Sequence, residues 1–188
     1  MCHSQHLDSN TEKNTSVTLP CFAVRVKPRH EKAVTECLRH KGYPVFLPLY
    51  SSTHRSGGRT QRVDLPLFPG YTFSRFDPTN RLPILTTPGV FSILSDGKTL
   101  LPIPEHELSA IQRSLESGLV VHPWPELRVG DRVYIVEGPI RGVEGTLQSV
   151  KGRDCLIVSV TLLCRSLAIE IDRAWTKPCK SQTAKVQG

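Results

Sequence analysis

The sequence predicts an α+β protein made of two modules, an N-terminal α/β sandwich followed by a small C-terminal SH3-like β-barrel. Up to Gly118, apolar residues switch repeatedly between strand-like alternation and helical spacing. A stiff segment with paired prolines follows, and beyond it β-branched runs recur between glycine-bearing turns. We therefore divide the chain into a disordered leader 1–19, an N-terminal sheet flanked by helices 20–118, a linker 119–125, a barrel 126–176 and a disordered tail 177–188.

The first half of the N-terminal module begins with a predicted strand, because residues 21–27 alternate in polarity. Apolar residues at helical spacing follow Pro28 and end at Gly42, which suits a left-handed helix terminus. A second extended run covers residues 43–50. Gly57-Gly58 then marks the tip of a hairpin, and strand alternation resumes on its far side.

The second half of the module alternates in the same way between strands and helices. A short helix is expected within residues 77–87, and a strand at 90–94 joins a strand at 99–103 through a tight turn. Pro104 then opens an amphipathic helix that ends at Gly118. This order of elements predicts a sheet covered by helices.

The predicted barrel contains four short strands rich in β-branched residues, at residues 131–136, 145–150, 154–160 and 165–171. Between the first two lies a loop with Gly138, Gly142 and Gly145. Three glycines at this spacing allow positive backbone dihedrals in a tight connection. Dense β-branched residues and glycines favour a stable barrel over a helical alternative.

Composition indicates a basic protein without a membrane span. Lys and Arg number 24 against 17 Asp and Glu, a net charge of +7, which favours approach to a polyanion such as nucleic acid. A merely basic globular protein is the alternative. The first twenty residues are polar and lack the apolar core of a secretory signal, so we expect a cytoplasmic protein.

No residue pattern predicts an enzyme, a metal site or a cofactor. None of the six cysteines forms a C-x-x-C pair, and several lie in apolar runs, as structural thiols do. Gly97-Lys98-Thr99 lacks the earlier glycine of a phosphate-binding loop. His106-Glu107 meets Ala110 where a zinc protease needs a second His. We assign no catalytic residues.

Two motifs carry a resemblance to a known family. Residues 138–145, Gly-Pro-Ile-Arg-Gly-Val-Glu-Gly, resemble the KOW motif of NusG and certain ribosomal proteins. Residues 67–73, Leu-Phe-Pro-Gly-Tyr-Thr-Phe, followed by Phe76-Asp77 and later by Thr87-Pro88-Gly89-Val90, resemble the signature of the NusG N-terminal domain. Together they cover roughly residues 21–175, the architecture of a NusG-type transcription elongation factor.

The run at residues 26–32 and the phrase Leu65-Pro66-Leu67-Phe68-Pro69 look closest to specialised UpxY and RfaH-like paralogues. Cys21 stands where many family members carry an aromatic residue. In the family this part of the module binds RNA polymerase, so the change bears on the strength of that binding and not on its location.

The resemblance implies that the N-terminal module binds the clamp helices of the largest RNA polymerase subunit through an apolar surface. By bridging the polymerase cleft, such a factor suppresses pausing or termination. The residues expected in this contact are Phe22, Phe68, Pro69, Tyr71 and Phe73. Aromatic side chains suit such an anchor because each buries a large area with few rotatable bonds. The alternative is an ordinary place in the core, which strand alternation imposes on at least one of them.

Basic residues form a second expected surface, toward the non-template DNA strand or the upstream duplex. They are Lys27, Arg29, His30, Arg55, Arg59 and Arg62. Their cations neutralise phosphates, but tight single-strand binding also needs aromatic stacking, and a solvated basic face is the equal alternative.

The resemblance gives the barrel the partners Rho or a small-subunit ribosomal protein, bound through Gly138, Pro139, Ile140, Arg141 and Gly142, and makes the chain a monomer. The rival hypothesis is a KOW-type ribosome-associated RNA-binding protein, in which residues 68–73 are only core. Mixed charge between residues 126 and 175 favours a protein partner for the barrel.

Overall fold

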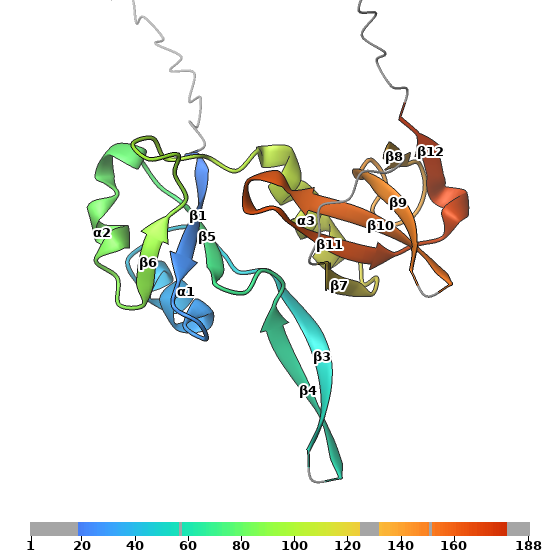
Figure 1. Cartoon of the computed structure of the whole chain (residues 1–188), viewed down its shortest axis with the longest axis horizontal. Helices are drawn as coiled ribbons and strands as arrows, with labels where there is room; N and C mark the ends of the chain where they lie inside the picture. The colour runs from blue at the N-terminus through green and yellow to red at the C-terminus, as the bar shows by residue number, and fades with distance from the viewer. Residues whose placement is uncertain (1–18, 57, 125–131, 151, 180–188) are drawn as a thin grey trace, which may run out of the picture.

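The computed structural model describes residues 19–179 except residues 57, 125–131 and 151, and leaves out the side chains of residues 54, 56, 59 and 150. The predicted leader, apart from its last residue, and most of the predicted tail lie outside the described residues. Figure 1 shows an N-terminal lobe and a β-rich C-terminal lobe with helix α3 between them, and a long hairpin that projects from the N-terminal lobe.

The N-terminal lobe is built on an antiparallel sheet with the strand order β2-β5-β1-β6. Its strands are β1 (Cys21–Val26), β2 (Val45–Phe46), β5 (Tyr71–Arg75) and β6 (Val90–Ile93). The central strand β1 pairs with β5 on one side and with β6 on the other, where the register shifts between Arg25 and Val26. The strands predicted at residues 21–27 and 90–94 are thus confirmed.

Strand alternation sends alternate residues of β1 into two separate cores. Phe22 and Val24 join a cluster with the helices α1 (Glu31–His40) and α2 (Leu82–Leu85). Ala23 belongs instead to the cluster that contains residues of α3 (Glu105–Glu116). All three helices lie where the sequence predicts them, and Gly42 has the expected left-handed backbone, with φ of 84°.

The predicted hairpin is confirmed as a two-stranded ribbon of β3 (Leu49–Ser56) and β4 (Arg59–Pro66), which pair along their full length. Eight residues at about 3.3 Å each give the ribbon a reach of roughly 26 Å. It stands away from both lobes (Figure 1). By contrast, the strand predicted at residues 99–103 is reduced to isolated bridges at Leu100 and Pro102.

The C-terminal lobe is a barrel-like antiparallel sheet with the strand order β12-β8-β9-β10-β11-β7. Its strands are β7 (Val121–Trp124), β8 (Arg132–Ile135), β9 (Glu144–Val150), β10 (Arg153–Val160), β11 (Arg165–Glu170) and β12 (Thr176–Pro178). The four predicted strands are all present within one or two residues.

The barrel extends further in both directions than the sequence predicts. Part of the expected linker forms β7 and pairs with β11, and the first residues of the expected tail complete β12, which pairs with β8. Each of the two strands contains a proline, Pro123 in β7 and Pro178 in β12. Both strands are the outermost of the sheet, where a proline can stand because one edge of the strand needs no hydrogen-bond donor.

The glycines of the barrel loop serve two different needs. Gly138 and Gly142 have φ of 81° and 84°, as predicted for a tight turn. Gly145 does not have a positive φ, and that part of the prediction is wrong. A Cβ at Gly145 would lie 2.5 Å from the backbone oxygen of Ile157, so this glycine is required for the close approach of β9 and β10.

Helix α3 joins the two lobes. Leu108 and Ile111, both fully buried, belong to one core cluster that includes Phe73 of the N-terminal sheet and Val158 and Val160 of the barrel. The two modules therefore share a continuous apolar core in this structure.

Polar contacts fix the same junction. The carboxylate of Glu107 is 7% exposed and accepts hydrogen bonds from the backbone N–H of Thr161, at 3.2 Å, and from its hydroxyl, at 2.6 Å. Further along α3, the guanidinium of Arg113 donates to the backbone oxygen of Arg141. A buried carboxylate that satisfies a backbone donor is costly to remove, so Glu107 locks the barrel to the helix.

Replacing Gly145 by Ala tests the close approach of β9 and β10. We expect Gly145→Ala to lower the free energy of unfolding by about 1–3 kcal/mol, because the new methyl group overlaps a backbone atom that cannot rotate away. Ser149→Ala, at an exposed site on the same strand, should change it by less than about 0.5 kcal/mol. Denaturant unfolding measures both, and a Gly145→Ala variant as stable as the original chain contradicts the packing described.

Replacing Glu107 by Ala tests the junction between the lobes. We expect a loss of about 1–3 kcal/mol in the free energy of unfolding, because the Thr161 donors lose their acceptor. Glu105→Ala is the matched control: it removes a carboxylate from the same first turn, but one whose side chain is 60% exposed and pairs with Arg75, a contact worth about 0–1 kcal/mol.

Hydrogen exchange at the Thr161 amide should accelerate in Glu107→Ala and stay unchanged in Glu105→Ala. Equal losses of stability and equal exchange in the two variants would show that Glu107 holds no interdomain contact.

Candidate functional site

Most of the aromatic side chains predicted to form the polymerase surface are buried. Phe68 is 1% exposed and Phe73 is fully buried, and their rings meet edge to face with centroids 5.8 Å apart. Phe22 is 2% exposed and packs against Phe76 in the other core. In this arrangement the three predicted phenylalanines are core residues, because α3 covers one face of the sheet and α1 and α2 the other. Their role in partner binding stays a prediction.

Pro69 and Tyr71, the other two residues of the predicted set, lie nearer the surface. Pro69 is exposed and Tyr71 is half-buried. Between them, Gly70 has φ of 85°, its N–H donates to the Glu31 carboxylate at 2.8 Å, and its oxygen accepts from the N–H of Val26 at 2.8 Å. These bonds hold the turn against β1 and the start of α1, and they fix the position at which Tyr71 emerges.

Tyr71 also lies at the contact between the lobes. The guanidinium carbon of Arg165, the first residue of β11, is 6.0 Å from the centre of the Tyr71 ring, within range of a cation–π interaction. The barrel therefore occupies part of the surface that the sequence assigns to a partner. Nothing in the sequence alone places the two modules relative to each other.

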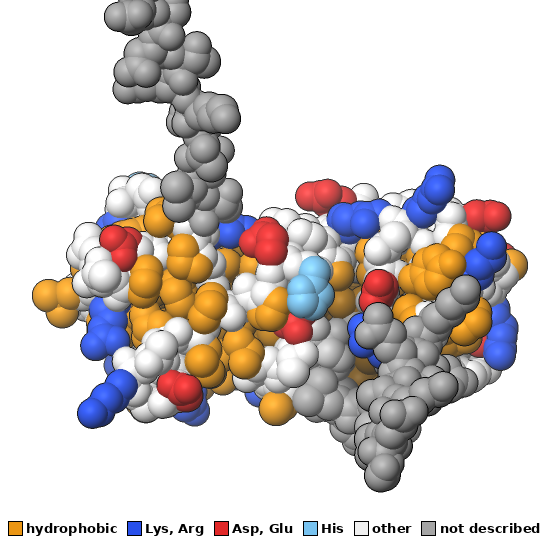
Figure 2. All heavy atoms as spheres, turned by 90° about the horizontal axis from the view of Figure 1, so that it is seen from above, with side chains coloured by type: hydrophobic (Ala, Val, Ile, Leu, Met, Phe, Trp, Pro, Cys, Tyr) orange, Lys and Arg blue, Asp and Glu red, His pale blue; other side chains and the backbone are white. Residues whose placement is uncertain are grey.

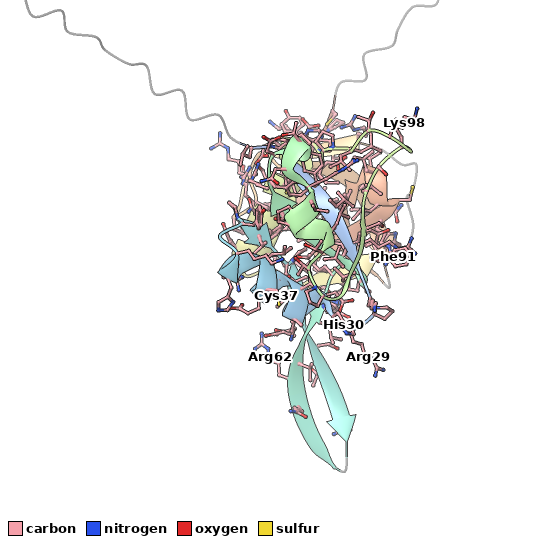
Figure 3. All side chains as sticks on the ribbon, turned by 90° about the vertical axis from the view of Figure 1, so that its left-hand side faces the viewer. Arg29, His30, Cys37, Arg62, Phe91 and Lys98 are labelled. Carbon is pink, nitrogen blue, oxygen red and sulfur yellow. The ribbon has the colours of Figure 1, made fainter. Side chains whose placement is uncertain are left out.

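Two residues near Tyr71, Arg25 and Phe91, were not predicted from the sequence to belong to a binding surface. Arg25 stands directly opposite Tyr71 in the β1–β5 register, and its guanidinium carbon lies 5.0 Å from the centre of the Phe91 ring. Phe91 is 66% exposed, and Figure 3 labels it above the loop that carries Arg29 and His30. An exposed Phe in a strand that otherwise faces a core was the signal available in the sequence, but only the strand register reveals its neighbour.

The predicted basic residues fall into two groups. Lys27, Arg29 and His30 are exposed on the loop between β1 and α1. This loop is rigidly placed: the N–H of Lys27 donates to the Gly89 oxygen at 2.8 Å, and a Cβ at Gly89 would lie 3.2 Å from the His30 ring. Arg29 has a left-handed φ of 66°, an uncommon backbone conformation for a residue other than glycine.

The second group lies on the hairpin. Arg55 and Arg62 are exposed and share one face of the ribbon, because Arg62 pairs with Thr53, two residues from Arg55. The side chain of Arg59 lies outside the described residues. Figure 3 shows Arg62 on the hairpin, on the same side of the lobe as Arg29 and His30. The loop and the hairpin therefore present their basic residues on the same side of the N-terminal lobe, but as two separate groups.

The barrel loop expected to bind a partner is anchored from inside. Ile140 is fully buried, and a Cβ at Gly138 would lie 2.9 Å from the Trp175 ring. Pro139 and Arg141 are exposed, but the backbone oxygen of Arg141 accepts the hydrogen bond from Arg113 of α3. The loop thus presents only a few side chains outward and is itself part of the junction with α3.

Two buried cysteines have raised pKa values. Burial raises the pKa of the Cys21 thiol to about 11, against the weaker opposing effect of Arg75, so Cys21 behaves as an apolar side chain. Burial likewise raises the pKa of Cys155. The described part of the chain has no group of three or more His, Cys, Asp or Glu side chains arranged to hold a metal ion. No helix in it is long and apolar enough to span a bilayer.

A groove with a volume of about 750 Å³ runs along the seam between α3 and the barrel. Its walls include Arg113 on the helix and Arg132 and Glu144 on the barrel, and the last two form an ion pair at 3.2 Å. Figure 2 shows, on the face seen from above, hydrophobic side chains gathered over the N-terminal lobe and mixed charges along the barrel. On that face, hydrophobic side chains also lie over part of the barrel.

Comparison with known proteins agrees with this geometry. Residues 21–112 match the sequence model of the family described as transcription termination factor nusG. The transcription termination/antitermination protein NusG of Thermus thermophilus is 28% identical over 147 residues, 72% of this chain and 80% of the relative. Its counterpart in Halalkalibacterium halodurans is 25% identical over 170 residues, 86% of this chain and 96% of the relative.

A solved structure shares the fold. The structure titled "Domain interaction in Thermotoga maritima NusG" superposes with a TM-score of 0.52 at 20% sequence identity, over 84% of this chain and 96% of that one. The matched family model runs from β1 to residue 112 within α3, a stretch that contains Tyr71, and the match to the Halalkalibacterium halodurans relative extends into the barrel. Residues 21–112 therefore belong to the NusG family, and the chain as a whole is similar to NusG transcription termination/antitermination proteins.

Proposed function

We propose that this chain binds elongating RNA polymerase through the surface around Tyr71 and suppresses pausing or termination. The observation that carries the proposal is the family match over residues 21–112, which includes Tyr71, the one aromatic of the predicted set that is not fully buried. The target on the polymerase is the pair of clamp helices of its largest subunit. The proposal needs no catalytic step, because holding the cleft closed raises processivity by binding alone.

The hairpin supports the bridging part of the proposal. A ribbon with a reach of roughly 26 Å, standing clear of both lobes, can touch the far side of a cleft while the Tyr71 surface holds the near side. Its arginines, with Lys27, Arg29 and His30, then face the non-template DNA or the upstream duplex. Contacts of this kind weaken steeply with salt because they release counterions.

Binding at Tyr71 requires the barrel to move. Arg165 now lies over the Tyr71 ring, and the Arg141 loop is tied to α3. A polymerase that takes Tyr71 displaces Arg165. The barrel loop becomes available to Rho or to a small-subunit ribosomal protein once the barrel also leaves α3, which breaks the bonds of Arg113 and Glu107. We propose Pro139 and Arg141 as its outward contacts, with the glycines shaping the loop and Ile140 anchoring it.

The remaining assignments follow from the family. We propose a cytoplasmic monomer that acts as an operon-specific paralogue, with an N-terminal module at residues 20–118 and a barrel that starts at β7 and ends at β12.

The ribosome-associated RNA-binding hypothesis is less well supported. It needs free cations on the barrel, but Arg132, Arg153 and Arg173 each lie within 4 Å of a carboxylate, at 3.2, 2.8 and 3.6 Å. Cations that are already paired give little net attraction to a polyanion.

Copurification with core RNA polymerase tests the proposal. We expect Tyr71→Ala to weaken binding about tenfold or more, because a central aromatic anchor is lost. Tyr134→Ala, which removes an exposed aromatic from the barrel, should bind as the original chain does. Both sites are at least partly exposed, so both variants should fold, which circular dichroism checks. A wild-type chain that fails to bind polymerase but sediments with ribosomes or structured RNA would refute the proposal.

A further inference from the structure

Three side chains form a row across the N-terminal sheet. Arg25 and Tyr71 are directly opposite each other on β1 and β5, so they project from the same face of the sheet. The Arg25 guanidinium reaches over Phe91 of β6, at 5.0 Å from the ring centre, on the other side of β1. The row therefore reads aromatic, cation, aromatic across three neighbouring strands, and it continues outward from the position where the barrel touches Tyr71.

The central cation of the row is Arg25. Among the described side chains, no carboxylate lies within salt-bridge distance of Arg25, whereas Arg75 on the neighbouring strand is paired with Glu105 at 2.6 Å. Arg25 is exposed, so in this arrangement water solvates its charge. A partner that covers Tyr71 and Phe91 together must also cover Arg25 and remove that water. Burying a guanidinium without a counter-charge opposes binding more strongly than the flanking rings favour it.

We propose that Arg25 and Phe91 extend the polymerase contact beyond Tyr71, and that the protein surface they meet carries a carboxylate between two apolar contacts. This inference rests on the proposed function, because it takes the occupant of Tyr71 to be polymerase. Arg25 forms an ion pair with this carboxylate, and Phe91 and Tyr71 exclude water on either side of the pair. The specificity of the contact then comes from a single charge at its centre.

A protein occupant fits the row better than a nucleic acid does. Another protein surface, the start of β11, already sits on Tyr71 through Arg165, and the rest of the row is continuous with that contact. The cations expected to meet phosphates, Lys27 and Arg29, lie beyond the end of β1, on the loop to α1, and are not part of the row.

The sharpest test is Arg25→Leu in the full chain, measured as the dissociation constant for core RNA polymerase without nucleic acid. If the partner presents a carboxylate, the variant leaves it buried and unpaired, and binding weakens about 30-fold or more. If the partner is apolar at this point, Arg25→Leu removes an unpaired charge and binds as tightly as the original chain or more tightly, which would overturn the inference.

Phe91→Ala tests the outer end of the row, with Leu82→Ala as its matched control. The two side chains are 66% and 67% exposed, but Leu82 lies on α2, outside the row. We expect Phe91→Ala to weaken polymerase binding about 5- to 30-fold and Leu82→Ala to leave it within about twofold. Equal effects of the two would show that Phe91 is not a specific contact.

The outcomes separate this inference from the proposed function. If the original chain binds polymerase and depends on Tyr71, but Arg25→Leu and Phe91→Ala bind normally, only the extended row is wrong. If the original chain does not bind core polymerase at all, the proposed function and the inference fall together. If the two variants bind core polymerase normally but lose affinity for single-stranded DNA, the row is a nucleic-acid surface and the inference is also wrong.

Discussion

The packing of α3 between two β-structures is the interaction on which the rest of this molecule depends. Leu108 and Ile111 belong to a core that contains both Phe73 of the N-terminal sheet and Val158 of the barrel. The same helix uses Glu107 to satisfy the backbone at Thr161. Because α3 packs against both lobes, the two modules are held together in this arrangement and are not joined by a linker alone.

That junction decides which surfaces are available. The phenylalanines of the family motif supply the core of the N-terminal lobe, while Tyr71 emerges at its edge under Arg165. Arg25 and Phe91 remain exposed beside it. A partner can therefore approach the free end of the row first and then displace the barrel from Tyr71. Such an exchange costs little at Arg165, since a partly exposed cation–π contact contributes only about 0.5–1 kcal/mol. The hydrogen bonds of the buried Glu107 to Thr161 hold the barrel to α3 more strongly than Arg165 holds it to Tyr71.

Much of the fold follows from the sequence because periodicity and turn residues are local signals. The helices, the hairpin and the four main barrel strands lie where these signals place them. The edge strands β7 and β12 could not be predicted in this way. Each contains a proline, which argues against a strand unless the strand lies at an edge, and an edge position depends on the whole sheet. Likewise, the contact of Gly145 with Ile157 depends on the distance between two strands.

The candidate site was predictable only in part for the same reason. The motif at residues 67–73 located the correct segment, but it could not say which aromatics α3 covers. The Arg25–Phe91 pair depends on a register shift between β1 and β6 that no local pattern reveals. Long-range pairing thus accounts for both the buried phenylalanines and the overlooked row.

We propose that this chain meets RNA polymerase at the surface around Tyr71. A photo-reactive amino acid introduced at position 71, irradiated in a reconstituted elongation complex and mapped by mass spectrometry, tests it most directly. We expect a cross-link to the largest polymerase subunit and fewer cross-links to the barrel than in the free chain. Cross-links that stay within the barrel when polymerase is present, or that reach only nucleic acid, would contradict it.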